Sequence, residues 1–356
     1  MKFSIAINMI RAGPSQDMRE VCRHALELAQ IADRAGFETA WVSEHHAIEM
    51  TISPNPFVLL SHWAAHTDSI RLGTAVVVAP YWHPIRLAGE AALTDVLCDG
   101  RLELGIGRGA YQYEFDRMAG GMPQKQGGEY VKEIIPAVRA LWQGDYAHAG
   151  ELWSFPSVTS VPKPVQKPHP RIWVAARDPD TFDWAVQNNC DIMTTPLRKP
   201  FSEVQSLVER FEAAVAAHPG VARPEHMMLR LACVVEKEQD AETPARAVVD
   251  FWRHFENLYT GRGTVNNGFP EPVDWEVIRG KENCAPEDLC ENMLFGTPAQ
   301  IVAKLKRYQA AGVEHLLYGA NFGMPHAMTK RSLQLFISEV MPHFREASDA
   351  DQRRAM

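Results

Sequence analysis

Two stretches decide how this chain folds: Thr39-Ala-Trp-Val-Ser-Glu-His-His46 and Arg101-Leu-Glu-Leu-Gly-Ile-Gly-Arg-Gly109. Each is an apolar run of strand length that ends in a polar cluster. In α/β barrels the loops at the carboxyl ends of the strands carry the chemistry, because they vary without disturbing the core. Histidine can move protons near neutral pH, and glycines beside an arginine let backbone N–H groups and a guanidinium approach a phosphate. The two stretches therefore predict a phosphorylated cofactor with a histidine beside it.

The same alternation of strand and helix continues along the chain. We predict eight strands, at residues 3–9, 39–43, 70–78, 101–106, 171–176, 191–195, 227–236 and 315–318. Helical periodicity, with Asp17 as the first N-cap and Gly36 as the first stop, is found at residues 17–35, 54–66, 84–97, 128–142, 179–187, 201–217, 297–311 and 329–344. Strands that alternate with helices form a parallel sheet. Their number favours an α/β fold of the TIM (β/α)8 barrel type, with an open doubly wound sheet as the alternative.

Two segments interrupt this alternation within what we predict to be one domain over residues 1–356. Residues 151–170 contain five prolines, which indicates an inserted hairpin or an extended excursion. Residues 261–292 are rich in glycine, proline and asparagine and poor in apolar residues. Loops of this length in compact domains are usually functional or mobile, so we expect a long lid loop over the strand ends, before the last strand.

Composition argues against some classes of partner. Lys and Arg total 36 against 44 Asp and Glu, a net charge of −8, which disfavours nucleic acid and anionic membranes. No apolar run reaches the roughly 20 residues of a membrane helix. The six cysteines form no CxxC pair and are typical of thiols in a reducing cytoplasm. His62 and His66 share a predicted helix face, but no third ligand accompanies them, so we predict no metal site.

Several blocks of the chain are similar to one known family. They are Gly36-Phe-Glu-Thr-Ala-Trp41 with Glu44-His-His46, Asn55-Pro-Phe57, Leu72-Gly-Thr-Ala75, Pro80 to Pro84, Asp99-Gly-Arg101 with Gly105-Ile-Gly-Arg-Gly109, Gly296-Thr-Pro298 and Glu339-Val-Met-Pro342. In this order and spacing the chain resembles the bacterial luciferase-like flavin-dependent monooxygenases, most strongly the luciferase alpha subunit. The resemblance implies a TIM-type barrel that binds FMN at its carboxyl-terminal face and forms dimers.

The resemblance also assigns residues to roles. His45 matches the histidine over the flavin that acts as acid or base, and Glu44 is expected to orient one of the two neighbouring histidine rings. Arg108 matches the arginine that binds the FMN phosphate, beside Gly107 and Ala110. Further matches are the non-prolyl cis peptide under the flavin ring (Ala75 and Val76), polar positions near the site (Tyr111 and Glu114), a histidine at the site entrance (His83), and a turn that donates N–H groups to the cofactor (Ala176, Arg177 and Asp178).

The function that the resemblance implies is an FMNH2-dependent monooxygenase of a two-component system. A separate NAD(P)H:flavin reductase supplies reduced FMN, O2 adds to the flavin as a C4a-(hydro)peroxide, and a small organic substrate such as an aldehyde or ketone is oxygenated. The chain departs from luciferase at Gly107, where luciferase has a reactive cysteine, at Thr195-Pro196, and in a shorter mobile loop. These departures enlarge or reshape the pocket and argue against light emission.

Two other functions remain open on the same residues. One is hydride transfer by an F420-dependent oxidoreductase, and the other is a non-catalytic subunit similar to luciferase beta. We also expect a homodimer, because the predicted helices at 54–66 and 84–97 are apolar on more than one face.

Overall fold

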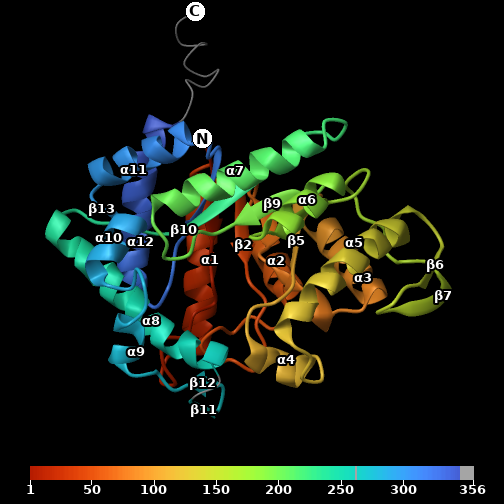
Figure 1. The fold of residues 1–356 in the computed structure, drawn as a ribbon, viewed down its shortest axis with the longest axis horizontal. Helices are drawn as coiled ribbons and strands as arrows, with labels where there is room; N and C mark the ends of the chain where they lie inside the picture. Colours follow the sequence, from red (N-terminus) through yellow and green to blue (C-terminus); the bar gives the residue numbers. More distant parts are fainter. Residues whose placement is uncertain (261–262, 345–356) are drawn as a thin grey trace, which may run out of the picture.

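The computed structural model describes residues 1–260 and 263–344. In these residues, eight parallel strands close into a barrel (Figure 1). In their order around the barrel they are β1 (Lys2–Ala6), β2 (Thr39–Val42), β3 (Arg71–Thr74), β5 (Leu102–Gly107), β8 (Arg171–Ala175), β9 (Asp191–Thr194), β10 (His226–Val234) and β14 (His315–Gly319). The sheet closes because β10 pairs with both β9 and β14, and β14 pairs with β1. The predicted TIM barrel is confirmed, and the open sheet is wrong.

Large side chains fill the barrel, so it is a packed core and not a pore. Trp41 and Trp173 meet edge to face with their ring centroids 5.4 Å apart, in a cluster that includes Met193. A Cβ at Gly73 would lie 2.3 Å from the Trp41 ring. The glycine therefore makes room for the indole, and a larger residue there would displace the core of the barrel.

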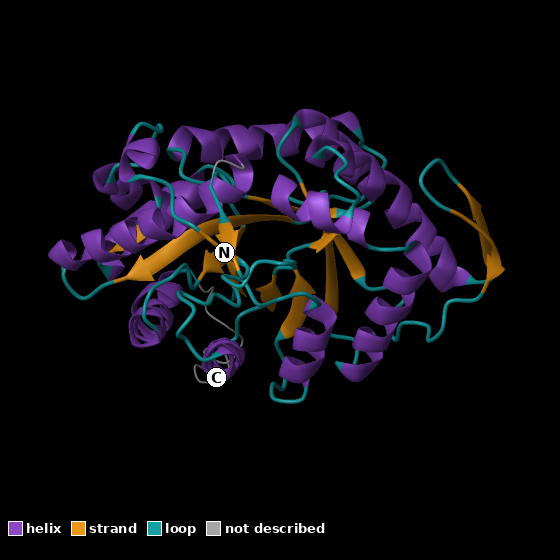
Figure 2. Cartoon of the chain, turned by 90° about the horizontal axis from the view of Figure 1, so that it is seen from below, coloured by secondary structure: helices purple, strands orange, loops and turns teal. Residues whose placement is uncertain are grey.

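The outer helices follow the strands and cover their outer faces (Figure 2). They are α1 (Met18–Arg34), α2 (Pro56–Ala64), α3 (Pro84–Leu97), α5 (Gly127–Gln143), α6 (Pro179–Gln187), α7 (Phe201–Ala217), α11 (Pro298–Ala310) and α12 (His326–Leu335). Asp17 caps α1 by accepting a bond from the N–H of Arg19 at 2.9 Å, and Gly36 follows the helix at φ 74°. Both predicted boundaries of this helix are confirmed.

The last predicted helix differs in detail from residues 329–344. It begins earlier, at His326, and gives way to a π-helical turn at Phe336–Val340 and a 3₁₀ turn at Met341–His343. Pro342 lies in that final turn, and proline lacks the N–H that a continued α-helix needs.

The inserted hairpin is present, and it begins earlier than the predicted insertion at residues 151–170. Strands β6 (Tyr146–Ala149) and β7 (Ser154–Val158) form an antiparallel pair that projects from the barrel after α5 (Figure 1). The first strand therefore lies before residue 151. The proline-rich remainder turns back to the barrel, where the N–H groups of Val165 and Gln166 donate to Asp95. Four of the five prolines lie in this return, and Pro156 lies within β7.

The predicted lid loop is largely structured, which the sequence analysis did not anticipate. It is preceded by a long helix, α8 (Glu242–Thr260), and residues 261–262 lie outside the described part. Within it are β11 (Val265–Asn266), β12 (Phe269–Pro270), α9 (Trp275–Arg279) and α10 (Pro286–Asn292), and β13 (Leu294–Gly296) then extends β10 before the last strand. Single apolar residues such as Ile278 and Leu289 anchor the short helices in a second core, too few to produce a periodic signal.

The remaining described elements are short and lie near the strand ends. They are β4 (Val77–Val78), which extends the edge of β3, the helix α4 (Gln112–Met118), and 3₁₀ turns at Ala79–Tyr81, Gln124–Gln126 and Glu238–Ala241. Among the described residues, no helix is long and apolar enough to cross a membrane.

Candidate active site

The predicted site residues gather at the carboxyl ends of the barrel strands. His45 follows β2, the cis peptide follows β3, Arg108 follows β5 and Arg177 follows β8. Helix α4 and the β11–β12 hairpin lie at this same end, toward the bottom of Figure 1. The barrel therefore brings together residues that are far apart in the sequence.

His45 is paired with a buried carboxylate. Its Nδ1 lies 3.3 Å from both carboxylate oxygens of Glu114, and its side chain is 17% exposed against 1% for Glu114. The N–H of His46 also donates to Glu114, at 2.6 Å. A carboxylate at Nδ1 favours the tautomer with the proton on that nitrogen, which makes Nε2 the basic position. The geometry suits a histidine that exchanges a proton through Nε2.

Glu44 orients the other histidine. Its carboxylate lies 2.6 Å from Nε2 of His46 and accepts bonds from the N–H of Val78 at 2.7 Å and from the indole N–H of Trp82 at 2.9 Å. Of the two histidine rings that Glu44 was predicted to orient, the one it contacts is that of His46. These bonds attach the loop after β2 to β4, which is a positioning role. The carboxylate that contacts His45 is that of Glu114 and not that of Glu44.

The peptide bond between Ala75 and Val76 is cis, as the resemblance implies. Both residues pack on the cluster that fills the barrel. A Cβ at Gly107 would lie 2.6 Å from Cγ2 of Val76, so the glycine and the cis peptide are close neighbours. The space left by the missing side chain at Gly107 is filled by Val76. This departure from luciferase therefore reshapes the site more than it enlarges it.

The far end of the site is cationic. Arg108 and Arg177 are both exposed and extend from the neighbouring strands β5 and β8. Burial raises the pKa of the Asp178 carboxyl. The hydrogen bonds from Thr181 and, to a smaller extent, the positive charge of Arg108 lower this pKa by more than burial raises it, so the net shift is downward. A guanidinium group at this end of the barrel suits a phosphate.

The turn before α6 offers fewer N–H groups than predicted. The N–H of Ala176 donates to the carbonyl of Met193 at 3.0 Å within the barrel. The Asp178 carboxylate caps α6 and accepts from the N–H of Thr181 at 2.9 Å, and Pro179 has no N–H. Of the predicted residues in this turn, Ala176 therefore uses its N–H within the barrel. Ala110 is exposed on the loop after Arg108.

An aromatic wall lies beside the histidine. The Tyr111 ring lies 5.5 Å from the His45 ring, 5.3 Å from Phe255 and 4.8 Å from Tyr259, measured between centroids. Burial, followed by the neighbouring Tyr259 and Glu114, raises the pKa of Tyr111 well above its usual value. The phenol therefore remains a neutral hydroxyl at physiological pH. Phe255 and Tyr259 belong to α8. This helix was not predicted, although its apolar residues recur at helical spacing.

His83 lies away from this group. Its ring accepts a bond from the N–H of Ile85 at 3.3 Å as the N-cap of α3, and it packs against Phe155 of the projecting hairpin at 5.5 Å. These contacts give no support to its predicted catalytic role. His62 and His66 have rings 4.7 Å apart, and no group of three or more metal-ligating side chains occurs in the described part of the chain.

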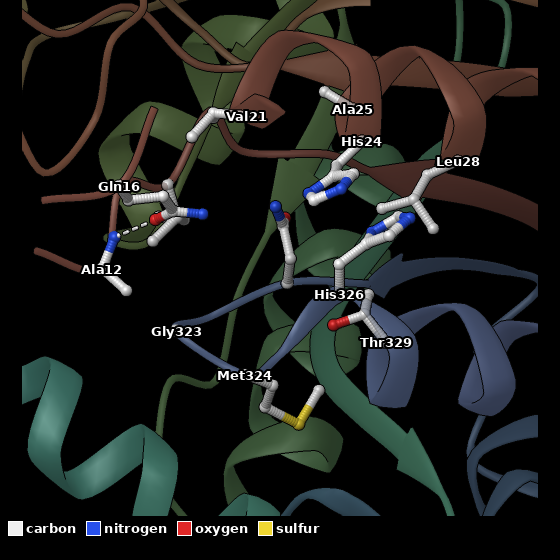
Figure 3. A pocket seen from close by; sticks show the side chains of 12 residues that line it. Ala12, Gln16, Val21, His24, Ala25, Leu28, Gly323, Met324, His326 and Thr329 are labelled. Atoms are coloured by element: carbon white, nitrogen blue, oxygen red, sulfur yellow. Dashed lines mark hydrogen bonds between the residues drawn. The ribbon is translucent and has the colours of Figure 1, made fainter. Parts of the chain in front are cut away.

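Two cavities lie close to the strand ends. The larger, about 490 Å³, is lined by His45, Tyr113 and mainly apolar residues of the loop after β2, with Asn267 and Gly268 of the β11–β12 turn opposite. The smaller, about 50 Å³, lies between α1 and α12, where the rings of His24 and His326 stack at 3.7 Å (Figure 3). None of the predicted site residues lines the smaller cavity, so the larger one is the candidate substrate pocket.

Comparison with known proteins identifies the family. The luciferase-like monooxygenase family model matches residues 1–315. The oxygenase component of the flavin-dependent trigonelline monooxygenase of Acinetobacter baylyi is 42% identical over 100% of this chain and 98% of its own. The alkanal monooxygenase alpha chain of the Kryptophanaron alfredi symbiont is 24% identical over 94% of this chain and 96% of its own. The crystal structure of the monooxygenase RslO1 from Streptomyces bottropensis superposes with a TM-score of 0.81 at 26% identity, covering 97% and 100% of the two chains.

The chain thus belongs to the luciferase-like monooxygenases. It is an enzyme, a flavin-dependent monooxygenase that uses O2 as co-substrate. The resemblance drawn from the sequence blocks is confirmed at the level of the family.

Proposed function

We propose that this chain is the oxygenase component of a two-component monooxygenase that takes up reduced FMN from a separate NAD(P)H:flavin reductase. The observation that carries the proposal is the His45–Glu114 pair at the same barrel mouth as two exposed arginines. In such an enzyme the protein supplies a group that transfers a proton and a site that binds the cofactor phosphate. We place this chemistry in the cytoplasm, where the nicotinamide reductant is available.

Each group of residues has a distinct task in this proposal. Arg108 and Arg177 bind the phosphate, while Ala75, Val76 and Gly107 form the surface on which the flavin ring rests. Bound reduced flavin supplies the electrons with which O2 is activated. His45 moves the proton through Nε2, and Glu114 holds its ring and stabilises the protonated form. The aromatic wall at Tyr111 limits the access of water, which protects reactive species from hydrolysis.

The substrate we propose is a small charged heteroaromatic carboxylate related to trigonelline. The basis is the 42% identity to the trigonelline monooxygenase component and the cavity of about 490 Å³ beside His45. That cavity is in the usual size range for a small-molecule site. Glu49 lies on its wall, so a negative charge is present there for the positive ring of such a substrate. This proposal names a narrower class of substrate than the sequence did, which indicated a small organic molecule such as an aldehyde or ketone.

Anaerobic titration with reduced FMN, followed by admission of O2, tests the cofactor and the reaction class. We expect tight binding and a transient absorbing species distinct from both reduced and oxidised FMN. Turnover with trigonelline and with a long-chain aldehyde should then be compared. Binding of reduced F420 in preference to reduced FMN, with turnover that needs no O2, would establish the deazaflavin alternative instead.

Replacing His45 by Ala tests the proton role. We expect a loss of turnover of about 10²- to 10⁴-fold, the usual contribution of general acid–base catalysis, with binding of reduced FMN retained. Unchanged turnover in this variant would remove His45 from the mechanism. Retained FMN binding is the control that separates a lost proton donor from a damaged cofactor site.

We also propose that the chain forms a homodimer through α2 and α3. These helices pack against each other and expose large apolar side chains, namely Val58, Leu93, Val96 and Leu97. Clustered exposed apolar side chains on a soluble protein commonly mark an interface, and a second copy of the same face is self-complementary in a two-fold dimer.

A further inference from the structure

Glu49 supplies the negative charge of the candidate substrate pocket. It lines the cavity of about 490 Å³ together with His45 and Tyr113. Among the described residues that line this cavity, Glu49 is the only carboxylate, and none is a lysine or an arginine. A ligand there therefore meets a single acidic side chain, in the same cavity as the histidine to which we assign the proton transfer.

Arg11 holds this carboxylate by one of its two oxygens. Its Nη1 donates to Oε2 of Glu49, while Oε1 has no hydrogen-bond partner among the described residues. The Arg11 side chain is 11% exposed and the Glu49 side chain 35%, and of the two only Glu49 lines the cavity. The ion pair as a whole is neutral, but a ligand in the cavity meets its negative member.

The position of Glu49 is fixed by neighbours on both sides. Arg11 is itself anchored, because its Nε donates to the carbonyl of Gln16 at 2.8 Å and its guanidinium carbon lies 5.3 Å from the centroid of the Phe269 ring. The N–H of Glu49 donates to the carbonyl of Gly268 at 2.8 Å. The carboxylate is thus ordered before a ligand arrives, so binding does not have to supply the free energy of ordering it.

A cationic aromatic ring fits these features. A pyridinium nitrogen that carries a methyl group has no N–H to donate, so its charge is recognised by an opposite charge and by aromatic or apolar surface. The cavity offers both, in the free oxygen of Glu49 and in its mainly apolar lining with Tyr113. A neutral substrate would gain nothing from the carboxylate and would displace water from it, which costs free energy.

We propose that Glu49 is the specificity-determining residue for a positively charged ring, and that Arg11 positions its carboxylate through Oε2. The inference rests on the proposed function, because it concerns the substrate of that same site. It assigns Glu49 to substrate binding, while the proton transfer stays with His45. Changing Glu49 should therefore act on Kd and KM for the charged substrate.

The test compares the binding of trigonelline, an N-methylpyridinium carboxylate, with that of nicotinate, which lacks the methyl group and, at neutral pH, the ring charge. Calorimetric titration of the protein in the presence of FMN gives both Kd values, and we expect the wild type to prefer trigonelline. In Glu49→Gln that preference should fall by about tenfold or more, because the cation loses a charged partner and Arg11 is left unpaired. The amide oxygen can still accept the bond from Arg11, and the backbone bond to Gly268 remains.

Two further variants separate charge from shape. Glu49→Asp keeps the carboxylate and should retain part of the preference that Glu49→Gln loses. Glu271→Gln is the matched control: it removes an exposed carboxylate just after β12, where Glu271 accepts a bond from Asn266 at 3.0 Å, and should bind both ligands as the wild type does. The two ligands differ by the same methyl group in every protein, so a change in the ratio of Kd values reports the ring charge.

The outcomes separate the inference from the proposed function. If the wild type does not bind reduced FMN, or does not turn over trigonelline with O2, the proposed function is wrong. If the wild type turns over trigonelline but binds it no better than nicotinate, or if Glu49→Gln changes the two Kd values equally or not at all, Glu49 does not select the ring charge. A loss confined to kcat, with KM for trigonelline as in the wild type, would also overturn the inference, because Glu49 would then act in the chemical step.

Discussion

Glu114 is the residue that holds the His45 ring. It is almost fully buried and bonds both the His45 ring and the N–H of His46. We predict that Glu114→Gln lowers turnover by about 10- to 100-fold, the usual cost of losing a carboxylate that orients a functional histidine, and leaves FMN binding unchanged. Steady-state kinetics with a parallel flavin titration would show this.

A double variant distinguishes a positioning role from an independent one. If Glu114 acts only through His45, then His45→Ala combined with Glu114→Gln should be no slower than His45→Ala alone. Losses that multiply would show that Glu114 contributes to the reaction by another route.

His226 couples stability to pH at the opposite end of the barrel. Burial, with smaller effects from Arg223 and His315, lowers its pKa from 6.5 to about 4. The unfolded chain binds a proton at His226 near pH 6.5 and the folded chain only near pH 4, so stability is full above this window and is lost as pH falls through it. The loss attributable to this histidine is on the order of 2–3 kcal/mol.

His226→Gln should flatten that part of the pH dependence. The amide can still bond the hydroxyl of Thr194, which lies 2.9 Å from Nε2 in the native protein. Urea unfolding at about pH 7.5 and pH 5 measures the difference, and carboxylates elsewhere contribute equally to both proteins. An identical drop in the variant and the wild type would refute the assignment.

At the level of elements, β5 can approach the cis peptide only because residue 107 is glycine. In Gly107→Ala the new Cβ would lie 2.6 Å from Val76, and this overpacking should cost about 1–3 kcal/mol and weaken flavin binding. Gly128→Ala in α5 is the matched control, because a Cβ there meets nothing within 4 Å. That change should be neutral or stabilising by up to about 1 kcal/mol. Denaturant unfolding of the two variants, with flavin titration, checks both expectations.

The elements after β10 show how the site is completed from a distance. The N–H of Glu49 donates to the carbonyl of Gly268 at 2.8 Å, which attaches the β11–β12 turn to the loop that carries His45. Helix α8 supplies Phe255 and Tyr259 to the wall around Tyr111. The segment expected as a lid, residues 261–292, therefore contains a small hairpin and two short helices, and only its residues 261–262 lie outside the described part.

For the whole molecule, the exposed apolar side chains of α2 and α3 predict the state of association. Val58→Asp combined with Leu93→Asp should convert a dimer to a monomer, because two buried charges at each copy of a two-fold interface are repelled and desolvated. Val277→Asp in α9, also an exposed apolar side chain, is the control and should leave the dimer intact. Light scattering reports the mass, and a wild type that is monomeric at micromolar concentration would contradict the proposal.

Much of the barrel could be predicted from the sequence because its signals are local. Buried parallel strands such as β2 and β5 are continuous apolar runs, and the helix limits at Asp17 and Gly36 follow from capping and from the left-handed glycine conformation. The order of strands in a barrel follows the order in the chain. His45 and Arg108 could be placed at the same face for that reason alone.

What the sequence could not determine are the pairings made across the barrel mouth. Glu44 is adjacent to His45, yet its carboxylate binds His46 and Trp82 while Glu114 binds His45. Likewise, Val76 fills the space beside Gly107, and α8 brings Tyr259 to Tyr111. Such contacts depend on the closure of the sheet and on helix docking, which fix side-chain directions to within an ångström. Local periodicity determined the fold, and tertiary packing alone decided which side chains meet at the mouth of the barrel.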